Sequence, residues 1–166
     1  MTIPFAALVS LLAALLETTV LPEIPIAGAS PDLVLVVAVT ATLVMGIEDG
    51  LIAAFVGGLL IDMLIPARPL GAETLALLLV VGIAAAVARV AGPSRRWLAV
   101  ALTVVLTPVL HVVLAIVLVL TEGAPLSFDF VAMLVAAFMN GLIAIPLAAL
   151  FGALEQRFGV TERVDW

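Results

Sequence analysis

Long apolar stretches constrain the fold of this chain more than any other feature. Of its 166 residues, 66% are hydrophobic and 11% are charged, whereas soluble domains are roughly half apolar and about a quarter charged. A helix that crosses a bilayer needs roughly 20 apolar residues, and fewer where protein surrounds the span. We therefore predict an all-α, polytopic membrane protein.

Six stretches are apolar enough to predict six transmembrane helices. Their expected bounds are residues 3–21, 33–45, 51–65, 70–90, 97–120 and 130–154. The second and third are short, so a re-entrant hairpin that leaves four spans is the alternative. We expect residues 1–154 to form one transmembrane domain and residues 155–166 to form a short cytoplasmic tail.

Capping signals set the expected start of the second and third helices. Ser30 is the predicted N-cap of the second helix, with Asp32 near its positive end. The segment "GIEDG", residues 46–50, is expected to interrupt the pattern, with Glu48 and Asp49 at the start of the third helix.

Arginine positions predict the orientation in the membrane, since the chain has no lysine. Positively charged loops remain cytoplasmic, and six spans place five of the six arginines on one side. These are Arg89, Arg95, Arg96, Arg157 and Arg163. Arg68, on the opposite side, is the exception. We predict a multi-pass protein of the bacterial cytoplasmic (inner) membrane with both termini inside.

Several classes of function lack support in the sequence. One histidine and no cysteine make a zinc site or thiolate chemistry unexpected. The sequence contains no G-x-x-x-x-G-K-[ST] loop, and its serines lack a recognisable triad pattern. A net charge of −6 does not favour nucleic acid. We expect no catalytic residue, no metal, no cofactor and no nucleic-acid partner.

Small residues recur at intervals of four along the predicted third helix, so they share one face. Such residues allow neighbouring helix backbones to approach closely. The members of this packing face are Gly50, Ala54 and Gly58, with Gly57 beside them. Asp62 continues the face and is expected to point at protein, because a carboxylate in hydrocarbon is costly.

Asp62, His111 and Asn140 fall at similar predicted depths in the membrane. At 1.5 Å per helical residue, Asp62 lies roughly 18 Å and His111 roughly 21 Å from the cytoplasmic starts of their helices, and Asn140 comes close to that level. One polar cluster is therefore expected. It is either a set of interhelical hydrogen bonds that fix packing, or a proton relay or ligand pocket.

Asp62 is also a candidate anchor for the turn that follows its helix, which Pro66 and Pro69 end. The orphan groups at such a boundary need partners. We predict that Asp62 accepts hydrogen bonds from Arg68 or from backbone N–H groups near Gly71. On this hypothesis an Asp62→Asn protein keeps its fold and its partner binding, whereas Asp62→Leu loses both. If Asp62 instead belongs to a proton relay, Asp62→Asn abolishes function in a protein that still folds.

A second stripe of small residues lies on the first helix, formed by Ala6, Ser10 and Ala14. Such a stripe serves either as the face that receives a partner helix or as an internal packing face. Composition does not decide between these two interpretations.

Several motifs of the chain resemble those of the rod shape-determining protein MreD family. "PDLVLVVAV" opens a short helix, and "GLIAAFVGGLLIDMLIPARPLG" follows it. The order Asp62, then Pro69, Leu70 and Gly71, is typical of the family, and "NGLIAIP" at residues 140–146 is similar to its Asn…Pro pair. The resemblance extends over most of residues 3–154.

This resemblance implies a non-enzymatic part of the machinery for cell elongation and peptidoglycan synthesis. It implies binding to MreC, a single-span protein, and through MreC to the MreB filament, the glycosyltransferase RodA and a class B penicillin-binding transpeptidase, within membrane lipids. The family fold resembles the substrate-binding subunits of energy-coupling-factor transporters. A small-molecule-binding subunit of such a transporter is the first alternative function. A small membrane enzyme of lipid metabolism is the second, and the absence of catalytic motifs counts against it.

Reporter fusions test the predicted topology. A reporter active only in the cytoplasm is expected to be active after Trp166, and one active only outside is expected to be active within residues 23–29. The physical reason is the retention of arginine-rich segments on the inner side. An external reporter that is active after Trp166 would contradict the predicted orientation.

Overall fold

The computed structural model describes residues 2–23, 28–65, 69–90, 95–123 and 129–158. These residues form six α-helices and one 3₁₀ turn, η1, at Leu21–Glu23. The helices are α1 (Thr2–Thr19), α2 (Leu33–Val44), α3 (Ile47–Leu64), α4 (Ala72–Val90), α5 (Arg95–Glu122) and α6 (Phe130–Phe158). The prediction of an all-α chain with six helices is confirmed.

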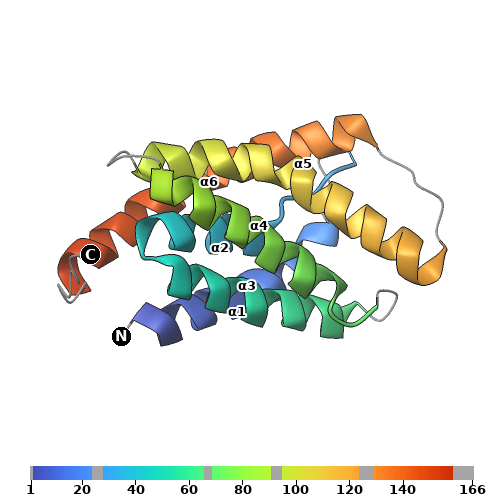
Figure 1. Cartoon of the computed structure of the whole chain (residues 1–166), viewed down its shortest axis with the longest axis horizontal. Coiled ribbons are helices and arrows are strands. Elements are labelled where there is room, and N and C mark those ends of the chain that lie inside the picture. Colours follow the sequence, from blue (N-terminus) through green and yellow to red (C-terminus); the bar gives the residue numbers. More distant parts are fainter. Residues whose placement is uncertain (1, 24–27, 66–68, 91–94, 124–128, 159–166) are drawn as a thin grey trace.

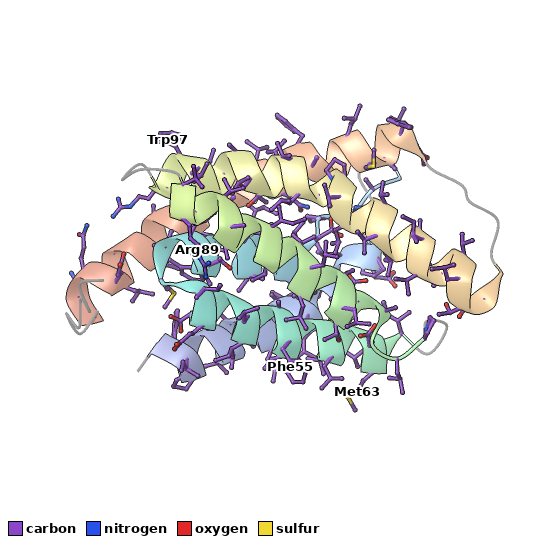
Figure 2. All side chains as sticks on the ribbon, in the orientation of Figure 1. Phe55, Met63, Arg89 and Trp97 are labelled. Atoms are coloured by element: carbon purple, nitrogen blue, oxygen red, sulfur yellow. The ribbon has the colours of Figure 1, made fainter. Side chains whose placement is uncertain are left out.

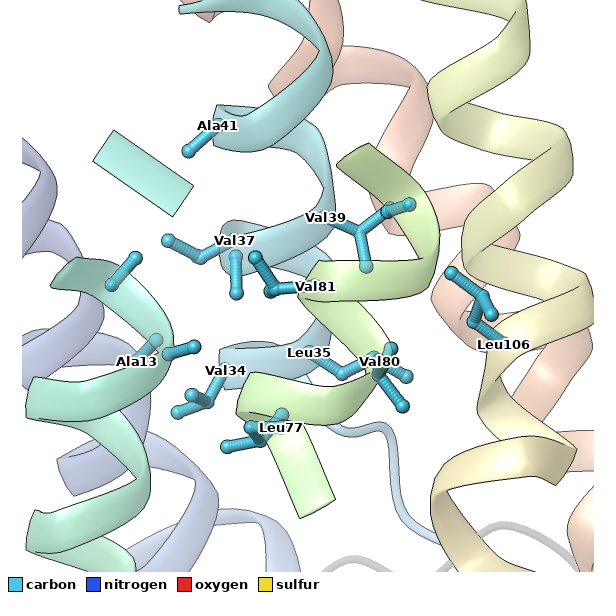
Figure 3. Packing of buried hydrophobic residues seen from close by; sticks show 14 of the residues in the cluster. Ala13, Val34, Leu35, Val37, Val39, Ala41, Leu77, Val80, Val81 and Leu106 are labelled. Carbon is cyan, nitrogen blue, oxygen red and sulfur yellow. The ribbon is translucent and has the colours of Figure 1, made fainter. Parts of the chain in front are cut away.

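Helix α2 is the centre of the bundle (Figure 1). It contacts all five other α-helices, which follow one another around it in the order α1, α3, α4, α5, α6. Every residue of α2 except Leu33 is buried. Figure 3 shows side chains of α2 packed beside those of α4, namely Val34, Leu35, Val37 and Val39 beside Leu77, Val80 and Val81. Because α2 has almost no surface left for lipid, its apolar sequence reflects contact with protein on all sides.

Four helices are long and apolar enough to cross a membrane, namely α1 with η1, α4, α5 and α6. Helix α2 has 12 residues, about 18 Å of helix against a hydrocarbon core of about 30 Å. Helix α3 has 18 residues but contains Glu48, Asp49 and Asp62. The six predicted spans thus consist of four helices that qualify by length and composition, together with the short, enclosed α2 and the more polar α3, which do not.

Several predicted helix ends differ from the structure. Residues 46–50 do not interrupt the chain, since α3 begins at Ile47 directly after Gly46, whose φ of 135° suits glycine. The N-cap of α2 is Asp32, not Ser30, and its side chain makes no capping hydrogen bond to α2. Helix α6 continues to Phe158, four residues beyond its expected end.

Helix α3 approaches its neighbours through glycines. A Cβ atom at Gly58 would lie 2.7 Å from the Cα of Thr74 in α4, and one at Gly50 would lie 2.9 Å from the Cα of Thr42 in α2. A Cβ at Gly57 would lie 2.5 Å from a methyl group of Val34. Ala54, on the same helix, is fully buried. These small side chains allow backbones to lie closer than larger residues permit.

The small-residue stripe of α1 is an internal packing face, so its interpretation as a partner face was wrong. Ala6, Ser10 and Ala14 each have an exposed fraction of 0%. The Ser10 hydroxyl donates a hydrogen bond to the Ala53 carbonyl of α3. Since α3 already occupies this face, a partner helix cannot reach it. The exposed apolar side chains of α1 include Leu12, which lies elsewhere on the helix.

Two glycine substitutions test the close approach of α3 to α4. Gly58→Ala is expected to lower stability by about 1–3 kcal/mol, because the new methyl group forces the two backbones apart. Gly82→Ala is the matched control, since nothing lies within 4 Å of a Cβ there. It should leave stability unchanged or raise it slightly. Thermal unfolding in one detergent compares them, and equal melting temperatures would contradict this packing.

Candidate functional site at the acidic end

A buried carboxylate joins the end of α3 to the start of α4. Asp62 has an exposed fraction of 2%. Its Oδ1 accepts a hydrogen bond from the Glu73 N–H at 3.0 Å. Its Oδ2 accepts from the Gly71 N–H at 3.1 Å, the Thr74 N–H at 3.1 Å and the Thr74 hydroxyl at 2.6 Å. All four donors belong to the start of α4, so Asp62 caps a helix other than its own.

This arrangement satisfies groups that the α-helix itself leaves without partners. The first N–H groups of a helix have no intrahelical acceptor, and its N-terminus favours negative charge. Gly71, with φ of 94°, turns the chain into α4, and the Pro69 carbonyl accepts the Ala72 N–H at 3.1 Å. The predicted backbone donors near Gly71 are therefore present. Arg68, the other predicted donor, and Pro66 lie outside the described residues.

The start of α2 is held by side chains from α1 and α6. The Val34 N–H donates to Glu17 Oε2 of α1 at 3.0 Å. The Asp32 N–H donates to Asn140 Oδ1 at 2.8 Å, and Asn140 Nδ2 donates to Asp32 Oδ2 at 2.9 Å. Asn140 is fully buried. Its amide therefore pairs with Asp32 through both its acceptor and its donor, much as one peptide group pairs with another.

His111 joins this second network through α5. Asn140 Nδ2 also donates to the Thr107 hydroxyl at 3.0 Å, and His111 Nδ1 lies 2.9 Å from the Thr107 carbonyl. Within the described part of the chain, no hydrogen bond joins Asp62 to His111 or Asn140. The expected single cluster is thus two networks, one at α3–α4 and one at α2–α5–α6. The predicted depth of a residue along its helix axis does not specify the direction in which its side chain points.

A third helix begins on a carboxylate at the same end of the bundle. Asp129 Oδ1 accepts the N–H groups of Val131 and Ala132, each at 3.0 Å. The helices α2, α4 and α6 therefore all start beside carboxylates. We call this end the acidic end and define it by its carboxylates: Glu17, Asp32, Asp62, Glu73 and Asp129.

A cavity of about 510 Å³ lies at the acidic end. Its polar lining includes His111 and four carboxylates, those of Glu17, Asp32, Glu73 and Asp129. Its apolar lining comes mainly from α3, α5 and α6: Ile61, Ile65, Leu110, Leu114, Ala115, Ala132, Met133 and Ala136. No three His, Asp or Glu side chains of the described residues are placed to hold a metal ion. The cavity is therefore suited to a ligand that is partly polar and partly apolar.

Sequence reasoning identified Asp62 and Asn140 but missed their surroundings. From the sequence, Asp32 is expected only near the positive end of its own helix, and Glu17 has no assigned partner. Both act on segments that are distant in sequence, Glu17 on Val34 and Asp32 on Asn140. Both acids are visible in the sequence, but their partners depend on tertiary structure.

The fold and the acidic end define a helical integral membrane protein in which a short central helix is enclosed by five others. The chain belongs to the MreD family, since the family model described as rod shape-determining protein MreD matches residues 1–158. No curated protein and no solved structure matches the chain. The likeness to energy-coupling-factor subunits therefore stays a prediction. The family-like Asp62 and Gly71 belong to one hydrogen-bonded unit.

Substitutions of Asp62 test its capping role. Asp62→Leu leaves four donors without their acceptor and is expected to prevent stable folding. Asp62→Asn, which the sequence suggested would be tolerated, should lower stability by about 1–3 kcal/mol. The reason is that both carboxylate oxygens accept hydrogen bonds, so the asparagine NH₂ must face a backbone N–H.

The matched control is Thr74→Val, which removes the hydroxyl donor and leaves three backbone donors to Asp62. It is expected to cost about 1 kcal/mol, less than either Asp62 variant. Thermal unfolding in detergent ranks the three proteins. An Asp62→Leu protein that melts with the wild type would disprove the capping role.

Proposed function

We propose that this protein is a non-enzymatic component of the bacterial cell-elongation (rod) complex, located in the cytoplasmic membrane with both termini inside. The observation that carries the proposal is the match of the MreD family model to residues 1–158 of the 166-residue chain. Rod shape determination is the role that this family description states. Supporting peptidoglycan synthesis is the finer function that we infer from it.

The proposed direct partner is an MreC-type single-span membrane protein. Through this partner the chain would act on MreB, RodA and a class B penicillin-binding transpeptidase. The small-residue face of α1 is used internally, so the partner helix is expected on an exposed apolar surface. Phe55 and Met63 of α3 point away from the bundle in Figure 2 and are 51% and 64% exposed. Such faces meet either lipid or a partner.

The distribution of charged and aromatic side chains supports the proposed orientation. Arg96 lies at the start of α5 and Arg157 near the end of α6, and both are exposed. Trp97, beside Arg96, is 71% exposed and lies at the end opposite the acidic end (Figure 2). Exposed arginine is typical of the cytoplasmic side, and exposed tryptophan is typical of either membrane interface. The acidic end would then face outward.

A second candidate function is a small-molecule-binding subunit of an energy-coupling-factor-like transporter. The cavity of about 510 Å³ favours it, because ligand pockets commonly enclose a few hundred cubic ångströms. Gene neighbourhood discriminates between the candidates. A neighbouring gene for a coiled-coil single-span protein supports the rod complex, whereas an adjacent pair of ATPase genes supports the transporter.

Complementation tests the proposed function. Expression of this chain in rod-shaped cells depleted of their own MreD is expected to restore rods. The chain should also co-purify with a co-expressed MreC-type protein and leave an unrelated single-span protein unbound. Microscopy and quantitative co-purification are the measurements.

Two variants serve as controls for these assays. Gly82→Ala, which alters an exposed position with free space around it, should behave as the wild type. Asp62→Leu should fail through loss of the folded protein. A wild-type chain that accumulates in the membrane yet neither restores rods nor retains the MreC-type protein would reject the proposal.

A further inference from the structure

Two long helices of the bundle contain an internal proline, Pro108 in α5 and Pro146 in α6. A proline has no N–H group, so the carbonyl four residues earlier loses its partner within the helix, which weakens the helix and favours a bend there. The carbonyls concerned are those of Val104 and Leu142. We call the two weakened segments, residues 104–108 and 142–146, the proline turns.

The two proline turns lie side by side. A Cβ atom at Gly141 of α6 would lie 2.5 Å from a methyl group of Val104 in α5. Gly141 directly precedes Leu142, so each proline turn begins at this contact, which we call the crossing point. From there α5 and α6 diverge toward the acidic end (Figure 1). The two helices therefore have the geometry of two arms that leave a common crossing point.

The arms are less well packed than the other halves of the same helices. We define them as residues 111–122 of α5 and 130–135 of α6, all of them described, and none of these residues is buried. On the other side of the crossing point, Ala99 of α5 and Phe151 of α6 are fully buried in the core. Among the described helices, α6 packs against α2 and α5 alone. Segments with few buried contacts open at the lowest free-energy cost.

A buried hydrogen-bond network holds the crossing point together. Asn140, which precedes Gly141, donates from Nδ2 to the Thr107 hydroxyl at 3.0 Å. The same Nδ2 donates to Asp32 Oδ2 at 2.9 Å. Asn140 and Thr107 are both fully buried, and Thr107 directly precedes Pro108. The network thus ties the two helices to each other and to the start of α2 beside their weakest turns.

We propose that α5 and α6 form a hinge. Their arms swing about the two proline turns, and the network of Asp32, Asn140 and Thr107 is the latch that holds them in the arrangement of this structure. Leu114 and Met133 belong to the arms and line the cavity, so the swing changes the width of the cavity. This device depends neither on the identity of a partner protein nor on a ligand.

Pulsed electron paramagnetic resonance of the full chain in lipid nanodiscs tests the hinge. The chain has no native cysteine, so spin labels attach only at introduced sites. The arm pair, Ile116→Cys with Leu134→Cys, replaces two exposed side chains, one on each arm. The base pair, Ala101→Cys with Leu150→Cys, replaces two exposed side chains on the other side of the crossing point. We expect one main distance from each pair while the latch is intact.

Thr107→Val removes the hydroxyl that Asn140 binds, so the latch should open. The arm pair should then gain a second distance, and the base pair should keep its single one. Thr103→Val is the matched control. Thr103 is also fully buried and also donates to the carbonyl four residues earlier, but within the described chain its hydroxyl does not bind Asn140. Thr103→Val should leave both distances unchanged.

Replacing both prolines tests where the swing occurs. Pro108→Ala and Pro146→Ala restore the missing N–H groups and so strengthen both turns. When these two changes are added to Thr107→Val, the second distance of the arm pair should disappear. Hydrogen exchange of the unlabelled wild-type protein is an independent measurement. Residues 111–122 and 130–135 should exchange faster than the halves of α5 and α6 on the other side of the crossing point.

Four results would overturn the proposal. One is an arm-pair distance that Thr107→Val leaves unchanged. Another is an equal effect of Thr103→Val. The third is a second distance that persists when both prolines are replaced. The fourth is equal hydrogen exchange on the two sides of the crossing point, a result that decides the outcome by itself if Thr107→Val fails to fold.

Discussion

The hydrogen bonds between Asp62 and the start of α4 are the interaction on which the arrangement of α3 and α4 depends. In an apolar environment, no water satisfies the first N–H groups of a helix, so each needs an acceptor from protein. Asp62 supplies acceptors to Gly71, Glu73 and Thr74 together. Because the carboxylate belongs to α3, the cap that completes α4 also fixes the position of one helix against the other.

The glycine face of α3 makes this cap possible. Gly58 lies one turn before Asp62 on the same side of α3, and its missing side chain admits the backbone of Thr74. Thr74 is also the residue that donates two hydrogen bonds to Asp62. Close packing and polar capping thus act on the same turn of α4. A larger residue at position 58 would separate the backbones and lengthen the hydrogen bonds of the carboxylate.

The sequence predicted the elements well because spacing and hydropathy are local properties. All six helices, the buried face of α3 and a backbone-bound Asp62 follow from such patterns. The partners of polar side chains do not. Asn140 and Asp62 have similar predicted depths, yet Asn140 pairs with Asp32 across 108 positions of the sequence. Rotation about a helix axis and the choice among neighbouring helices depend on packing that no single segment encodes.

The stripe on α1 shows the same limit. Spacing indicated correctly that Ala6, Ser10 and Ala14 share a face, but it did not identify the helix that covers that face. The Ser10 hydroxyl donates a hydrogen bond to the Ala53 carbonyl, 43 positions away in the sequence, which shows that α3 covers this face. A stripe of small residues favours close helix packing equally, whether the neighbouring helix belongs to the same chain or to a partner.

The cavity and the central helix share residues, so the shape of the cavity depends on the contacts that hold the bundle together. Glu17 holds the Val34 N–H at the start of α2, Asp32 is the N-cap of that helix, and both line the cavity. Asp32 in turn holds Asn140, which binds Thr107 of α5. Side chains that line the cavity therefore also hold α2 against α1 and α6, and through Asn140 against α5.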